Sequence, residues 1–219
     1  REDTLELLRS VYAESSEDEL LEMMNYIKKR KDEEMMGGYS SHGLRKNKNL
    51  AKKAAVYLRK ASGPRVAVFE VNGFDTHAAQ GGVDGTHTEC LVEMDDIIKN
   101  LKANLKEAYQ DTIILTVTEF GRTIKQNGGN GTEHGYGTAI FMAGGLLKKS
   151  QVYTDWPGLK KKELFDGRDL NATIDARSIY ASAMSTVFDL DFNRIQKEVF
   201  WGEDLQDLSN KLFKAWWKN

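Results

Sequence analysis

The chain has 219 residues and a formal net charge of −2, with 40% hydrophobic and 29% charged residues. This composition is typical of a soluble globular protein. The charge gives no case for broad attraction to nucleic acid, and no run approaches the roughly 20 apolar residues of a membrane helix. Cys90 is the one cysteine, so no intrachain disulfide can form. No signal-peptide pattern is found at the amino end.

The amino-terminal part has a helical pattern. Residues 2 to about 36 carry apolar side chains at helical spacing, with Ser16 and Glu19 as a capping box. A glycine-rich stretch at residues 37–43 predicts a loop. We therefore expect residues 1–47 to form a helical segment, followed by a domain over residues 48–219.

The domain begins with an amphipathic helix expected over residues 50–61, ended by Gly63-Pro64. In the rest of the chain, predicted strands alternate with predicted helices. Three apolar runs predict strands at residues 66–71, 113–118 and 138–143, and helices are expected over residues 87–109, 178–188 and 205–217. This succession predicts an α/β fold with a parallel, buried sheet and helices on both faces.

Three predicted strands are few for a complete sheet, and two explanations are open. Either further strands lie within the first fifty residues, or another segment completes the sheet, because an average sheet has about 5–6 strands.

Three short polar clusters adjoin the predicted strands. Asp75 and His77 follow the first strand, Glu119 follows the second, and His134 precedes the third. Ligands of open α/β sheets gather at the carboxyl ends of strands. Carboxylate and imidazole groups placed there suit zinc, manganese or iron, so we predict a divalent metal site, with zinc favoured.

Each of these residues also has a simpler interpretation. Asp75 and His77, two positions apart on an extended backbone, can face one ion, or Asp75 can accept backbone N–H groups in a turn. Glu119 can bind an ion or form a salt bridge with Arg122. His134 can be a ligand or an exposed loop histidine.

The other two histidines and three of the arginines are assigned as follows. His87 starts the long helix near the same rim and can be a further site residue or a surface residue of the first turn, whereas His42 is expected to be structural. Arg122 could hold an oxyanion beside a metal through its planar guanidinium. Arg168 and Arg177 each neighbour an aspartate, which favours ion pairs that anchor loops.

At these residues the chain resembles a bacterial family of exported proteins, domain of unknown function 1501. The matching stretches, in order over roughly residues 48–200, are Gly73-Phe74-Asp75-Thr76-His77 with Gln80, Glu119-Phe120-Gly121-Arg122-Thr123, Gly131-Thr132-Glu133-His134-Gly135, Gly144-Gly145, Trp156-Pro157-Gly158-Leu159, Gly167-Arg168-Asp169-Leu170 and Thr173-Ile174-Asp175-Ala176-Arg177. Members of that family usually have Asp at the position of Glu133.

That family is in turn similar to the alkaline phosphatase and sulfatase superfamily. The resemblance implies a three-layer α/β/α, alkaline-phosphatase-like fold, and this chain is expected to be the carboxyl-terminal portion of such a protein or a shortened member. Asp75, His77, Glu119 and His134 match metal ligands of the superfamily, while Phe120 occupies a ligand position that it cannot serve. One metal site is therefore expected to be nearly complete and the other depleted.

The function implied is metal-dependent hydrolysis of a small-molecule or polymer phosphate or sulfate ester. Glu119, as ligand or general base, and Arg122, as oxyanion clamp, are the expected catalytic residues. No nucleophile is found, so a missing amino-terminal segment of the same protein is an expected partner. The alternative is a non-catalytic binding or scaffold protein, and the resemblance implies an exported or periplasmic location in either case.

Overall fold

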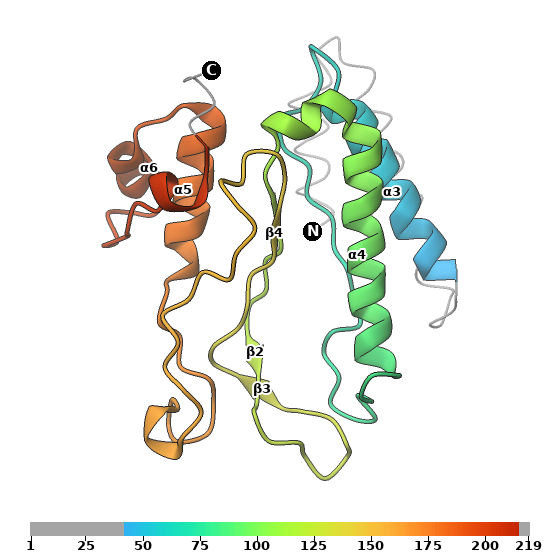
Figure 1. The fold of residues 1–219 in the computed structure, drawn as a ribbon, viewed down its shortest axis with the longest axis vertical. Coiled ribbons are helices and arrows are strands. Elements are labelled where there is room, and N and C mark those ends of the chain that lie inside the picture. Colours follow the sequence, from blue (N-terminus) through green and yellow to red (C-terminus); the bar gives the residue numbers. More distant parts are fainter. Residues whose placement is uncertain (1–41, 215–219) are drawn as a thin grey trace, which may run out of the picture. The chain divides into compact units, whose positions relative to one another are not determined.

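The computed structural model describes residues 42–214, which fold into helices joined by long extended segments (Figure 1). The expected helices of residues 2–36 lie outside the described residues. So does the expected amino-terminal segment of residues 1–47, except that residues 42–47 begin a helix. The described part belongs to the α/β class because it combines helices with two small antiparallel sheets. None of its helices is long and apolar enough to cross a membrane.

The first two helices of the described residues pack against each other through small and branched apolar side chains. Helix α3 spans His42–Leu58, which starts earlier than expected, and α4 spans Thr86–Leu105. Half of the residues in the extra first turns of α3 are leucine, arginine or lysine, which are good helix formers. Helix α4 continues into a 3₁₀ helix, η1, at Lys106–Asp111. The cluster between them is buried, and its members are Ala51, Ala55, Ile97, Leu101 and Leu105.

The strands differ from the prediction in length and direction, and the strand expected over residues 66–71 is not formed. Strand β1, Ile114–Leu115, pairs with β4, Met142–Ala143, and strand β2, Gly121–Arg122, pairs with β3, His134–Gly135. Both pairs are antiparallel, so the prediction of a parallel sheet is wrong for these strands. The reason is the glycine-rich loop between β2 and β3, which reverses the chain without the helical crossover that parallel strands need.

The segment that contains β1 contacts helices on both of its faces. Ile114 packs against the α3–α4 cluster. Its neighbours Ile113 and Leu115 pack against a second cluster, built on Ile179 and Leu208. This alternation is what an extended backbone produces, because successive side chains point to opposite faces.

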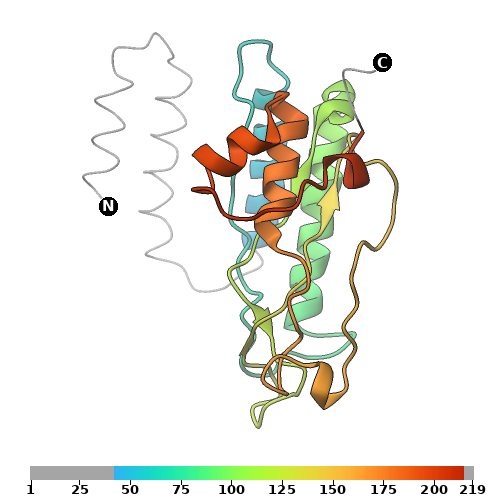
Figure 2. The same cartoon turned by 90° about the vertical axis from the view of Figure 1, so that its left-hand side faces the viewer.

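The carboxyl-terminal helices are α5 at Ala176–Phe188, α6 at Phe192–Glu198 and α7 at Ser209–Leu212 (Figure 2). The expected helix over residues 178–188 is confirmed, and a further 3₁₀ helix, η2, spans Lys161–Glu163. The expected helix over 205–217 is shorter than predicted within the described residues. Two hydroxyls of α5 explain this, because Ser178 Oγ and Ser182 Oγ accept the backbone N–H groups of Gln206 and Leu208.

Candidate metal centre

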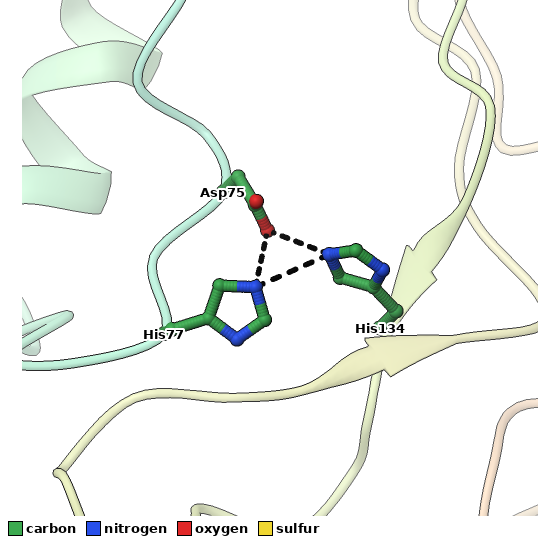
Figure 3. Close-up of side chains that lie close together, drawn as sticks. All are labelled: Asp75, His77 and His134. Carbon is green, nitrogen blue, oxygen red and sulfur yellow. Dashed lines mark hydrogen bonds and ion pairs between the residues drawn. The ribbon is translucent and has the colours of Figure 1, made fainter.

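Asp75, His77 and His134 meet at one point, each with its side chain about half exposed (Figure 3). The Oδ1 atom of Asp75 lies 3.1 Å from Nε2 of His77 and 3.2 Å from Nε2 of His134. The two Nε2 atoms are 3.2 Å apart. Three potential ligand atoms from two separate chain segments therefore form a nearly equilateral triangle.

Two loops hold these residues together. The backbone N–H of Thr132 donates to the carbonyl of Thr76, and that of Ala79 donates to the carbonyl of Gly129. A side chain at Gly131 would collide with the backbone of His77, since a Cβ atom there would lie 2.3 Å from its carbonyl carbon. Glycine is thus required at this position for the loop to bring His134 beside His77.

The donor triangle fits a transition-metal ion. Ligand atoms bound to zinc at 2.0–2.2 Å in a tetrahedron lie about 3.4 Å apart, and in an octahedron about 3.0 Å apart. The edges of 3.1 and 3.2 Å fall between these values. Two imidazole nitrogens and one carboxylate oxygen are also a common ligand set for zinc or iron, and they leave coordination positions open on the solvent side.

Arg122 binds a ligand residue rather than its sequence neighbour Glu119. Its Nη1 donates to Asp75 Oδ1, while Nε donates to Thr132 Oγ1 at 2.9 Å and Nη2 to the Thr132 carbonyl. Three of its five N–H groups are used in this way. The predicted alternative, a salt bridge between Arg122 and Glu119, is not found among the described residues.

The charges around Asp75 favour its ionised form. Desolvation opposes ionisation, but the hydrogen bond from Arg122 and the nearby charges of His77, Arg122 and His134 outweigh it and lower the pKa of Asp75 below its ordinary value of 3.8. Asp75 is therefore a carboxylate at neutral pH, which is the form that binds a metal.

The ring of Phe120 stacks on the imidazole of His134. The ring centroids are 3.9 Å apart and the planes differ by 16°. Stacking restricts rotation of the imidazole, so the aromatic side chain that cannot bind a metal itself holds a ligand side chain in place.

The other candidate residues lie outside the triangle. Glu119 is exposed and is not part of the three-residue group. His87 lies at the start of α4, where its ring meets Phe74 edge-on and its Nδ1 is buried without a hydrogen-bond partner. Arg168 and Arg177 pair with Asp169 and Asp175, as predicted.

Sequence reasoning missed two residues beside the triangle, Glu133 and Asn127. Glu133 Oε2 lies 3.1 Å from Nδ1 of His77, on the side of the ring away from Asp75. The Asn127 amide donates to Glu133 Oε1 and to the His77 carbonyl. The Asn-Gly-Gly-Asn-Gly run at 127–131 predicts the turn that places Asn127, but nothing in the sequence indicates which glutamate it meets.

One protein family has a model that matches residues 6–196 of this chain, and that family is described as a protein of unknown function, DUF1501. No curated protein and no solved structure matches the chain. The match covers all three residues of the triangle together with Glu133 and Arg122.

Proposed function

The chain belongs to the DUF1501 family, as its motifs predicted, and from this premise we propose that it binds one divalent metal ion, zinc being favoured. Asp75, His77 and His134 would be the ligands. The observation that carries the proposal is the donor triangle, whose edges of 3.1–3.2 Å match the spacing of ligands around one ion. Exposure on one side leaves room for water or substrate.

For the whole protein we propose metal-dependent hydrolysis of a phosphate or sulfate ester. A bound ion would polarise the ester oxygen or lower the pKa of a water molecule. Arg122 retains two N–H groups beyond the three already used, and these could bind an oxyanion. Glu119, exposed in the same segment as Phe120 and Arg122, is the candidate general base or additional ligand.

We further propose that the fold is the three-layer, alkaline-phosphatase-like one, completed by another segment. Support comes from residues 66–71, which run extended but are assigned to no strand. Val66 is 61% exposed and Val68 is 90% exposed. Such an apolar edge suits pairing with a further strand. The proposed source is an amino-terminal segment of the same protein, which would carry the nucleophile, and an exported or periplasmic location is proposed with it.

A second candidate function is a non-catalytic binding or scaffold role. The observation that favours it is the hydrogen bond from Arg122 to the same Asp75 oxygen that faces both histidines. A guanidinium in this position balances the carboxylate charge, so the cluster could be a structural ion-pair network that needs no metal.

Metal analysis of the purified chain distinguishes the two. After incubation with zinc and dialysis, we expect about one ion per molecule, and we expect His134→Ala to lose it with little change in melting temperature because the side chain is exposed. His87→Ala, outside the triangle, is the matched control and should retain the ion. A metal-free wild type would favour the scaffold role.

Turnover of aryl phosphates and sulfates by the same preparation tests the catalytic part of the proposal. We expect little or none from the 219-residue chain, because it carries no recognisable nucleophile. Robust turnover that disappears in His134→Ala would instead indicate a metal-activated water as the nucleophile.

A further inference from the structure

We infer that Glu133 is a positioning residue that fixes the tautomer of His77, so that Nε2 of this histidine presents its lone pair to the ion. The inference rests on the proposed metal site and adds to it a specific role for a residue outside the ligand triangle.

The two ring nitrogens of His77 face different partners. Nε2 points to Asp75 and His134, whereas Nδ1 lies 3.1 Å from Glu133 Oε2. A neutral imidazole has one N–H and one lone pair. If the Nδ1–H donates to the carboxylate of Glu133, the lone pair is left on Nε2, where the ligand atoms converge. Carboxylate–histidine pairs of this kind raise the basicity of metal ligands and orient their rings.

Asn127 has only one possible amide orientation. Its Oδ1 accepts the backbone N–H groups of Gly129 and Gly131, each at 2.9 Å. Its amide nitrogen must therefore donate, and it does so to the His77 carbonyl and to Glu133 Oε1. The other carboxylate oxygen of Glu133 is thereby directed toward His77.

The charge on Glu133 agrees with this role. The hydrogen bond from Asn127 exceeds the opposing effect of desolvation, and together with the hydrogen bond and charge of His77 it lowers the pKa of Glu133 below 4.5. Glu133 is thus an acceptor on both oxygens at neutral pH.

Replacing the Glu133 carboxylate by an amide of the same size reverses the hydrogen bond to His77. In Glu133→Gln, the side-chain oxygen must face the donating amide of Asn127, which turns the new NH₂ group toward His77. Nδ1 then has to accept, so the proton of a neutral His77 moves to Nε2, where it blocks metal binding. A variant that removes Asn127 as well, Asn127→Ala with Glu133→Gln, lets the glutamine amide turn over and restores the productive tautomer.

Zinc affinity and the tautomer of His77 are the two measurements. Competition with a chromophoric chelator should show about 10- to 100-fold weaker zinc binding in Glu133→Gln, the range found for outer-shell partners of metal ligands. The double variant should bind more tightly than Glu133→Gln alone. Glu107→Gln, on the exposed surface of η1, is the matched control and should equal the wild type.

Histidine ¹⁵N spectra of the metal-free proteins at alkaline pH separate failure of this inference from failure of the metal site. The wild type should show a proton on Nδ1 of His77, and Glu133→Gln should show it on Nε2. If the wild type binds no zinc, the proposed function fails, but the spectra still decide the role of Glu133. Identical His77 spectra in the two proteins, or zinc affinities that agree within twofold, would overturn the inference.

Discussion

At the metal centre and in the region around α5, hydrogen bonds from side chains to the backbone hold an extended segment in place. The two regions differ in how deeply these side chains are buried. At α5, the hydroxyls of Ser178 and Ser182 bind the backbone of residues 206–208, and both serines are at most 3% exposed. At the metal centre, Asn127 and Arg122 bind the backbone of His77 and Thr132, while the ligand side chains remain about half exposed.

This difference separates stability from function. The α5 hydrogen bonds lie beside the buried cluster of Ile179, Ala183, Leu208, Leu212 and Phe213, so losing them would leave unpaired polar groups without water. The polar groups of the metal centre can exchange their partners for water or an ion at small cost. We therefore expect changes near α5 to alter the free energy of unfolding, and changes at the centre to alter ligand binding.

The largest effect is expected from Leu208→Ala. The Leu208 side chain is fully buried in the cluster beside α5, so its truncation should lower the free energy of unfolding by about 2–5 kcal/mol. Urea unfolding measures this loss, with Leu159→Ala, at an exposed leucine, as the control. Zinc stoichiometry of the folded variant should be unchanged. If Leu208→Ala loses zinc under conditions in which it is fully folded, the α5 region and the metal centre are coupled.

An intermediate effect is expected from Arg122→Lys, measured as binding of inorganic sulfate or phosphate. The lysine ammonium cannot form the forked contacts of the guanidinium, and a charge-assisted bidentate contact contributes on the order of 1.5–3 kcal/mol. Anion affinity should fall by about tenfold or more, while the melting temperature stays within a few degrees. Arg194→Lys, at an exposed pair with Glu198, is the control.

The opposite pattern for Arg122→Lys would contradict its assignment. A large fall in melting temperature with unchanged anion affinity would make Arg122 a structural anchor of Asp75 and Thr132, which is the scaffold alternative.

The smallest effect is expected from Asp175→Ala. Asp175 caps α5 by accepting the backbone N–H of Arg177 at 2.8 Å, and loss of such a cap costs about 1 kcal/mol. Asp155→Ala, at an exposed aspartate, should cost much less. Equal stabilities of the two variants would show that the cap does not stabilise α5.

The stability that Asp175 contributes depends on pH. The hydrogen bonds from Arg177 lower the pKa of Asp175 in the folded protein below 3.8, against some desolvation. A lowered folded-state pKa gives stability that is fully present above the ordinary pKa and is lost as the pH falls through the folded-state value. The stability difference between wild type and Asp175→Ala should therefore be constant above about pH 5 and shrink at lower pH.

Part of the fold and of the candidate site could be predicted from the sequence. Helical spacing located α4 and α5 to within a few residues over most of their length, because their apolar faces repeat with the period of the helix. The polar clusters gave Asp75, His77 and His134, which the structure brings together. Glu119 was grouped with them on the assumption of parallel strands, and the antiparallel pairing leaves it outside the triangle.

By itself, the sequence determined helices α4 and α5, the family and the residue types of the donor set, since all of these depend on short-range pattern and side-chain chemistry. Only the tertiary structure decided which partner each polar group meets. It directed Arg122 to Asp75 rather than to Glu119, and Glu133 to Nδ1 of His77. The reason is that these contacts join residues 47 and 56 positions apart, and their geometry depends on how two loops pack rather than on either loop alone.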